Sequence, residues 1–172
     1  LVIGAGGVGL SAVHLAAAVT PAKLLVADID PKKREAALAA GAAAAVDNGQ
    51  RDDALRELRR LSGGGPAAAI DFVGAPATAQ FGIDALRRGG ALVVVGLYGG
   101  GVPLPIPVLP PQKLRVVGSY VGSLAEMRAL MDLVKSGRVP PIPVENRPLD
   151  AINATLDDLR AGRIVGRVVV QP

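Results

Sequence analysis

Short apolar runs with the character of strands alternate along this chain with longer segments whose apolar residues recur at helical spacing. The run 91–95 is entirely apolar and ends in three valines, which is typical of a strand buried on both faces of a sheet. Strands separated by helices indicate parallel pairing, and right-handed crossovers place those helices on both faces. The sequence therefore predicts an α/β fold with a doubly wound, six-stranded parallel sheet. The expected strands are 1–3, 23–27, 42–46, 67–73, 91–95 and 114–117.

The rest of the chain departs from this alternation. The segment 99–111 is rich in Pro and Gly and cannot be a central strand, because Pro donates no ladder hydrogen bond. It is expected to be an edge strand or an extended linker. A helix over 124–135 capped by Ser123, a final helix over 149–160 and a final strand over 164–170 should follow. We expect two parts, 1–121 with the sheet and 122–172 beyond it.

Composition excludes several kinds of site. The chain has no Cys and a single His, so neither a thiolate site nor a His-rich metal site can form, and no metal ligands are expected in it. Its net charge of +4 comes from 19 basic and 15 acidic residues interleaved along the chain. Aromatic residues, which stack on bases, are nearly absent, so binding to nucleic acid is not expected.

No apolar stretch reaches the roughly 20 residues that a membrane span requires, and no basic, apolar leader opens the chain. A cytoplasmic location is the default expectation. The first expected strand has only three residues although a doubly wound sheet places it at the centre, which suggests a fragment of a longer protein.

A glycine turn follows that first strand and opens the first helix. Gly4, Gly6 and Gly9 fit the pattern G-x-G-x-x-G in the required strand–turn–helix context. The first Gly allows the tight turn, the second lets the backbone approach a pyrophosphate, and the third lets helix and strand pack closely. The N–H groups at the helix start would face the phosphates.

An acid at the end of the second strand strengthens this signal. Asp28 lies 24 residues after Gly4, close to the spacing expected of an acid that binds ribose hydroxyls. Such a carboxylate would repel a 2′-phosphate, so NAD is favoured over NADP. The alternative is that Asp28 only caps the strand end. Asp30 is expected to be the N-cap of the next helix, and Lys33 either reaches the ribose edge or is an exposed helix residue.

Four blocks, in order, carry a resemblance to a known family: GAGGVGLSAVHLA, VADIDPKKREAALAAGA, AIDFVGAPATAQFGIDALRRGGALVVVGL and VVGSYVGSLAEMRALMDLVKSGRV. They resemble the coenzyme-binding half of zinc-type medium-chain alcohol dehydrogenases, over essentially the whole chain. The resemblance implies a doubly wound (Rossmann) fold, NAD as the cofactor and an alcohol or aldehyde as the substrate of the full enzyme.

The resemblance also implies roles for individual positions. The phosphate turn would comprise Gly4, Gly6, Gly7, Val8 and Gly9, with Val8 also behind the nicotinamide. Asp28 and Lys33 would flank the ribose, and Val73 would line the adenosine side. Segments at the nicotinamide would be Val95, Gly96 and Leu97 beneath the ring, and Ser119, Tyr120 and Val121 at the carboxamide. Arg167 would contact the pyrophosphate.

In that family, zinc ligands and the proton relay belong to an N-terminal catalytic domain. By this resemblance, zinc is expected only in that domain, and the chain alone should bind NAD without turning over alcohol. Residues from about 122 onward would return to that domain and pack loosely here, or on a neighbouring molecule. The segment 99–111 matches the edge through which family members form dimers, so a homodimer or tetramer is expected, with a simple linker loop as the alternative.

Two other functions share part of the pattern. Zinc-independent quinone or enoyl reductases of the same broad family share this architecture. They usually prefer NADPH and lack the acid at the end of the second strand. NAD-sensing modules of channels and transporters also combine a glycine turn with a strand that ends in Asp-x-Asp. The blocks RRGGALVVVGL and VVGSYVGS do not fit those modules.

Overall fold

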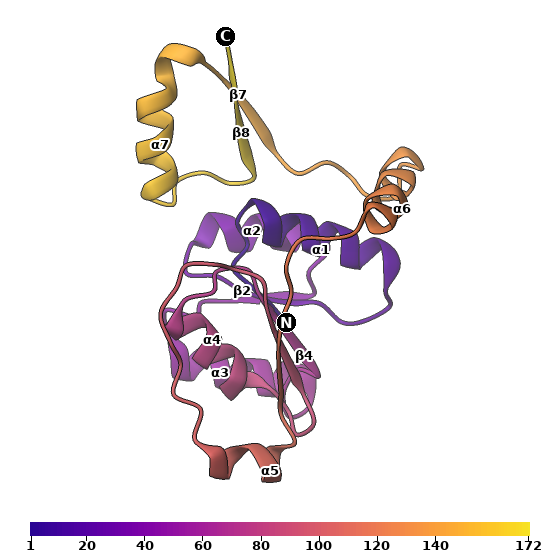
Figure 1. Ribbon diagram of the computed structural model, residues 1–172, viewed down its shortest axis with the longest axis vertical. Helices are drawn as coiled ribbons and strands as arrows, with labels where there is room; N and C mark the ends of the chain where they lie inside the picture. Colours follow the sequence, from indigo (N-terminus) through magenta and orange to yellow (C-terminus); the bar gives the residue numbers. More distant parts are fainter.

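A computed structural model describes residues 1–172, and its centre is a six-stranded parallel sheet (Figure 1). The strand order is β3-β2-β1-β4-β5-β6, and every neighbouring pair is parallel. The strands are β1 (Val2–Ile3), β2 (Leu25–Ala27), β3 (Ala44–Val46), β4 (Ala68–Asp71), β5 (Ala91–Val94) and β6 (Arg115–Gly118). This confirms the doubly wound sheet that the alternation predicts.

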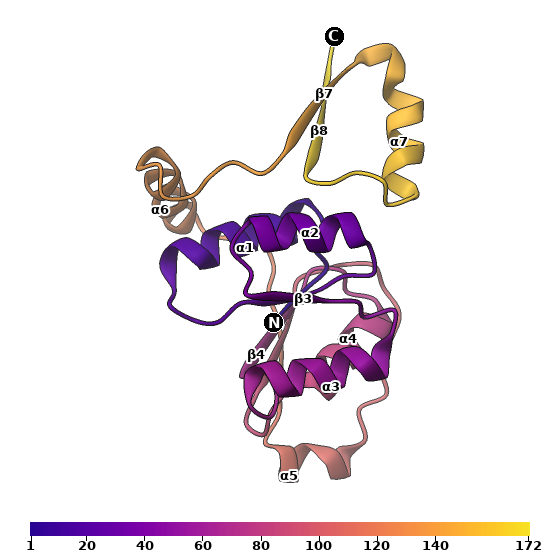
Figure 2. The same ribbon diagram turned by 180° about the vertical axis from the view of Figure 1, so that it is seen from behind.

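Four helices cover the two faces of the sheet. Helices α1 (Gly7–Val19) and α2 (Pro31–Ala39) lie on one face, and α3 (Arg51–Ser62) and α4 (Pro76–Ala85) lie on the other (Figures 1 and 2). Local chemistry sets their ends: Asp30 accepts a hydrogen bond from the Lys32 N–H at the start of α2, as expected, and Gly63 ends α3 with left-handed φ. No helix is long and apolar enough to cross a membrane.

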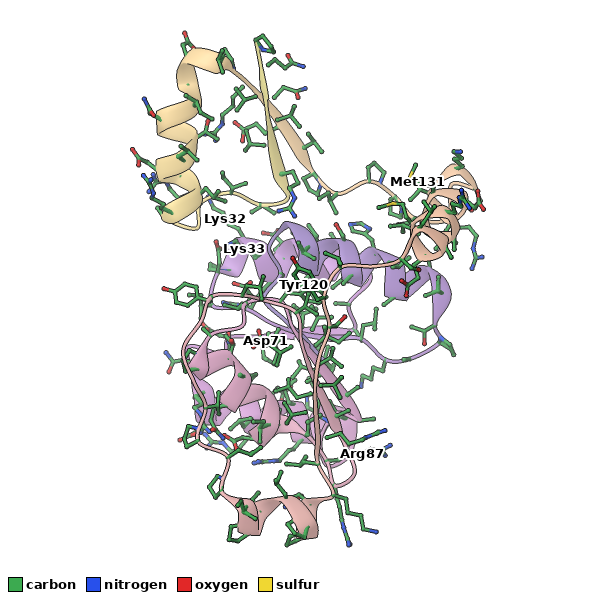
Figure 3. The ribbon with its side chains drawn as sticks, viewed as in Figure 1. Lys32, Lys33, Asp71, Arg87, Tyr120 and Met131 are labelled. Carbon is green, nitrogen blue, oxygen red and sulfur yellow. The ribbon has the colours of Figure 1, made fainter.

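The core has one layer on each face because consecutive residues of a strand point to opposite sides. Ile3 packs with Leu58 of α3, Phe81 of α4 and other buried residues. Its neighbour Val2 belongs to the cluster on the other face, with Leu10 and further residues of α1 and α2. Even a two-residue β1 thus joins both layers. Figure 3 shows Asp71 and Tyr120 toward one end of the sheet and Arg87 toward the other.

The segment 99–111 forms no strand. It runs as an irregular loop and then forms a 3₁₀ turn, η1 (Ile106–Val108), and a single helical turn, α5 (Leu109–Gln112). The segment therefore forms no edge strand within this chain, because its proline residues leave too few N–H donors for a ladder. Strand β6 forms the outer edge instead, and all four of its residues are exposed.

The C-terminal part begins with α6 (Leu124–Lys135), in which Ser123 and Glu126 form a reciprocal capping box. It ends in a separate parallel pair, β7 (Val144–Pro148) and β8 (Arg167–Gln171), joined through η2 (Leu149–Ala151) and α7 (Ile152–Arg160). The sequence pattern missed β7, since proline residues at 140, 141 and 143 read as a chain break. It also placed the start of β8 three residues early.

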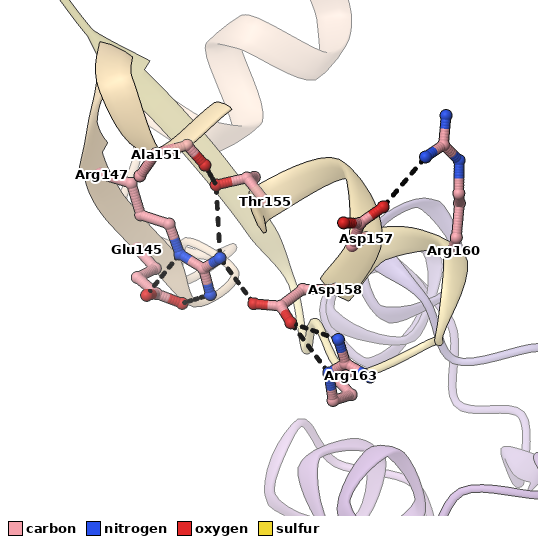
Figure 4. A network of polar contacts seen from close by, with 8 residues as sticks. All are labelled: Glu145, Arg147, Ala151, Thr155, Asp157, Asp158, Arg160 and Arg163. Atoms are coloured by element: carbon pink, nitrogen blue, oxygen red, sulfur yellow. Dashed lines mark hydrogen bonds and ion pairs between the residues drawn. The ribbon is translucent and has the colours of Figure 1, made fainter. Parts of the chain in front are cut away.

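Few side chains in this part are buried. Among residues 101–172 only Thr155 and Gly166 are, so almost all of the apolar core lies in residues 1–100. Polar contacts hold the pair β7–β8 to α7 instead (Figure 4). Arg147 donates to the Glu145 carboxylate at 2.8 Å, to Asp158 at 2.7 Å and to the Thr155 hydroxyl at 3.3 Å, and Arg163 also contacts Asp158.

Replacing Arg147 with methionine should loosen this network, because two carboxylates and a hydroxyl lose their shared donor. Amide hydrogens of β7 and β8 are then expected to exchange faster, while those of β1 and β4 keep their rates. Hydrogen exchange followed by mass spectrometry measures both. Equal exchange of β7 and β8 in the two proteins would contradict the assigned role of Arg147.

Acid should have the same local effect. Hydrogen bonds from Arg147 lower the pKa of Glu145, and those from Arg147 and Arg163 lower the pKa of Asp158. Groups with a lowered folded pKa bind fewer protons in the folded state, so the stability they contribute is lost as the pH falls below about 4. Hydrogen exchange of the β7 and β8 amides, compared between pH 6 and a pH below 4, should show a loss of protection in acid.

Candidate functional site

The candidate binding segments expected from the sequence lie together at the carboxyl end of the sheet. Each follows the carboxyl end of a strand, and parallel strands present those ends together. The strand order reverses between β1 and β4, and in open α/β sheets ligands bind in the crevice at such a point. The segments are the glycine turn after β1, Asp28 after β2, Val73 after β4, Val95–Leu97 after β5 and Ser119–Val121 after β6.

The first and third glycines of the turn are fixed by close packing. Gly4 has a φ of +86°, and a Cβ at this position would come within 2.6 Å of the Val73 Cγ2. A Cβ on Gly9 would overlap the carbonyl oxygen of Gly4. The start of α1 thus rests directly on the turn, as the pattern predicts, and no larger residue fits at either position.

The second glycine faces open space. No atom lies within 4 Å of the position that a Cβ on Gly6 would take, and no side chain caps α1. The first turn of a helix carries N–H groups without partners inside the helix. Val8 stands beside them with half its surface exposed. The turn therefore offers a bare backbone and unpaired donors to an anion.

A residue from the far end of the chain reaches this turn. The guanidinium of Arg167, in β8, lies over Gly7, where a Cβ would overlap it and would also come within 2.7 Å of the Gly166 carbonyl oxygen. The fold thus brings Arg167 to the glycine turn, although 160 residues separate it from Gly7. A cation at the start of α1 adds to the anion-attracting field of the helix N-terminus.

The carboxylate of Asp28 is buried against the turn, with 8% of the residue exposed. One oxygen accepts a hydrogen bond from the Ala5 N–H at 2.7 Å, and the other accepts one from the Asp30 N–H at 2.9 Å. Each carboxylate oxygen has a second lone pair, so both can also accept from a ligand hydroxyl. Asp28 therefore ties the end of β2 to the glycine turn.

Lys33 lies nearby but does not contact Asp28. Its ammonium nitrogen is 4.0 Å from an Asp30 carboxylate oxygen and 3.6 Å from the position of a Cβ on Gly162, in the loop after α7. Figure 3 shows Lys33 on the side of α2 that faces the C-terminal part of the chain. The structure therefore places Lys33 between the helix start and that loop, at the border of the site.

The segments after β4, β5 and β6 form a wall of the site, opposite the segments that follow β1 and β2 in the strand order. Gly74 and Gly96 pack so closely that a Cβ on either would overlap the backbone of the other segment. The Tyr98 N–H donates to the Val73 carbonyl at 3.3 Å, and the Ser119 N–H donates to the Val94 carbonyl at 2.9 Å. Leu97, Tyr120 and Val121 are each at least 77% exposed at the open side of this wall.

The sequence pattern did not single out two residues behind the site. Arg34 donates to the Asp28 carbonyl at 2.8 Å and pairs with Asp47 at 3.4 Å, so it braces the strand ends of β2 and β3. Asp71 ends β4 fully buried. An acid at the end of an apolar run, as in AAAID, was the available signal for Asp71, but no spacing rule distinguished it from an exposed strand end.

Together these features define a doubly wound domain with a dinucleotide-type phosphate turn and an acid at the end of the second strand. The chain belongs to the zinc-binding dehydrogenase family, whose model matches residues 7–136. It is 32% identical over its full length to an NAD-dependent alcohol dehydrogenase from Sulfurisphaera tokodaii, of which it covers 50%.

Two solved structures extend this comparison. The alcohol dehydrogenase of Aeropyrum pernix matches 99% of this chain with 35% identity and a TM-score of 0.91, over 49% of its own length. Acetophenone reductase from Geotrichum candidum, solved in complex with NAD, matches 99% with 26% identity and a TM-score of 0.85, over 47% of its length. The chain thus spans about half the length of the relatives it matches.

Zinc does not fit the residues of this chain. No group of three or more His, Cys, Asp or Glu side chains could hold a metal ion, and the lone His14 lies on α1 with its Nδ1 buried and unpartnered. A dinucleotide does fit, because Gly6 leaves its approach open while Asp28 accepts from the Ala5 N–H and Arg167 lies over Gly7.

Proposed function

We propose that this chain is the NAD-binding portion of an oxidoreductase that transfers a hydride between an alcohol and NAD and that depends on zinc in its complete form. One observation carries the proposal: the buried carboxylate of Asp28 is hydrogen-bonded to the backbone of the glycine turn and keeps lone pairs free on both oxygens. In this proposal Asp28 would bind the ribose, next to a glycine turn that would bind the pyrophosphate.

The residues would divide the work along the dinucleotide. The first turn of α1 and Arg167 would bind the pyrophosphate, Asp28 and Lys33 the adenosine ribose, and Val73 the adenosine side. Val8, the segment Val95–Leu97 and the segment Ser119–Val121 would position the nicotinamide. When bound, NAD supplies the ring that exchanges the hydride, and the chain's own contribution is to fix that ring in place and exclude water from one of its faces.

Asp28 favours this proposal over one rival, and family membership favours it over the other. Zinc-independent quinone or enoyl reductases share the architecture but usually prefer NADPH. In this chain the 2′-phosphate of NADPH would be repelled by the buried carboxylate of Asp28. An NAD-sensing regulatory module would share Asp28, but membership in the dehydrogenase family favours an enzyme.

We further propose that residues 1–121 are the cofactor domain and that 122–172 work with a catalytic half that carries zinc and the proton relay. The sparse burial beyond residue 101 and the half-length match to relatives support this division. Activity measurements test it. A protein that joins both halves should oxidise an alcohol with NAD, whereas the 172 residues alone should bind NADH without turnover. Dehydrogenase activity of the 172 residues alone would refute the division.

We also propose a homodimer or tetramer in the cytoplasm, assembled along the edge formed by residues 99–111 and β6. Open strand edges readily pair with another chain, and β6 exposes Val116 and Val117 at 46% and 49%. Ile106 adds an apolar side chain with 77% exposure. Sedimentation velocity should report more than one chain per particle, and a strictly monomeric protein at high concentration would exclude this assembly.

A further inference from the structure

Asp71, the last residue of β4, is a buried acid without a cation. None of its surface is exposed and it forms no ion pair. A buried carboxylate needs hydrogen-bond donors in place of water. Here all of them come from the loop after β4 and the start of α4. One oxygen accepts from the Val73 N–H at 2.9 Å and the Gly74 N–H at 3.0 Å, and the other from the Thr78 hydroxyl at 2.9 Å.

The backbone of the same residue holds a second segment. Its carbonyl oxygen accepts hydrogen bonds from the Val95 N–H at 2.9 Å and the Gly96 N–H at 3.0 Å. A single residue thus fixes the loop after β4 with its side chain and the loop after β5 with its carbonyl. Figure 3 shows Asp71 below Tyr120, toward the same end of the sheet.

Both loops contribute to the wall of the site. The first carries Val73, whose Cγ2 lies against Gly4 of the glycine turn, and the second carries Gly96, which packs on Val73 and Gly74. A shift of the first loop would therefore move the turn and the nicotinamide wall together. Thr78 closes the arrangement, because its hydroxyl also accepts from the Ala75 N–H at 3.1 Å at the start of α4.

We propose that Asp71 is a positioning residue for NAD: its buried carboxylate, held by the Val73 and Gly74 N–H groups and by Thr78, sets the wall against which the nicotinamide and the adenosine ribose are placed. This role rests on the proposed function. Asp71 touches no part of the cofactor and acts through the two loops.

Substitutions at Asp71 and Thr78 test the role by NADH fluorescence titration. Asp71→Ala leaves two partly buried N–H groups without an acceptor, and the loop shift is expected to weaken NADH binding by about tenfold or more. Asp71→Asn can still accept from both N–H groups and donate to the Thr78 oxygen, so it should restore affinity to within about threefold of wild type. Thr78→Val should fall between them, and Thr78→Ser should behave as wild type.

A matched control separates positioning from general destabilisation. Leu58→Ala opens a cavity in the core under α3, away from the wall, and should lower thermal stability while keeping the wild-type affinity for NADH. Wild-type affinity in Asp71→Ala, or an equal loss in Leu58→Ala, would overturn the proposal.

Hydrogen exchange distinguishes a failure of the proposed role of Asp71 from a failure of the proposed NAD-binding function. In Asp71→Ala the amides of Val73, Gly74, Val95 and Gly96 should lose protection selectively, and in Leu58→Ala they should not. If the wild-type chain failed to bind NADH, the proposed function would fall. Unchanged protection of the four amides would reject the wall-setting role of Asp71 even in a chain that binds NADH.

Discussion

Alanine at position 9 is expected to destabilise the fold by about 3 kcal/mol and to weaken NADH binding by about a hundredfold. The added methyl group would overlap the carbonyl oxygen of Gly4, which is backbone and cannot rotate away. Either α1 must move off β1 or the turn must open, and both changes displace the N–H groups that would bind the pyrophosphate. Thermal unfolding and NADH titration of Gly9→Ala measure the two effects.

Gly6→Ala is the matched control for this substitution. A methyl group at position 6 meets no protein atom within 4 Å and the backbone there has a negative φ, so the unfolding temperature should stay within experimental error of wild type. NADH binding should still weaken, because the second glycine is where the pyrophosphate approaches the backbone. Full stability and full affinity in Gly9→Ala would contradict the close packing of turn and helix.

Asp28→Ala has the second largest expected effect, on cofactor choice. NADH affinity should fall by about tenfold or more, because charge-assisted hydrogen bonds to the ribose are lost. NADPH affinity should fall less or rise, since the carboxylate that repels a 2′-phosphate is gone. The ratio of the two affinities should therefore shift toward NADPH by about tenfold, measured by parallel titrations with the two cofactors.

The same substitution also removes the acceptor of the Ala5 and Asp30 N–H groups, so some stability is lost with it. Asp30→Ala controls for that loss. It deletes the N-cap of α2, at a typical cost of about 1 kcal/mol, and leaves the ribose acid in place. Its NADH-to-NADPH ratio should equal that of wild type. An equal shift in both variants would mean that Asp28 has no special relation to the cofactor.

The arrangement of the sheet could be predicted because local signals agreed with one another. The glycine turn, the Asp30-Pro31 helix start and the valine run at 91–95 each lie where the fold places them. The segments that failed lack such agreement. β7 reads V-E-N-R-P, with one apolar residue and a terminal proline, and it pairs only with β8, so no alternating pattern marked it.

Local sequence patterns likewise predicted some residues of the candidate site and missed others. The spacing of Gly4 and Gly9 predicted the close packing of turn and helix that the structure forms. The position of Asp28 next to that turn follows because β1 and β2 are neighbouring strands. The place of Arg167 came from a family resemblance, since no local rule links β8 to the turn. Asp71 escaped notice because two of its three donors are backbone N–H groups, which every residue but proline offers and no sequence pattern displays.

The central claim is that this chain binds NAD at the turn between β1 and α1, and parallel titrations of the 172-residue protein with NADH and NADPH test it most directly. The account predicts one saturable site per chain, with NADH bound at least about tenfold more tightly than NADPH, as expected when a carboxylate replaces a phosphate-binding cation. No saturable binding of either cofactor, or tighter binding of NADPH, would contradict it.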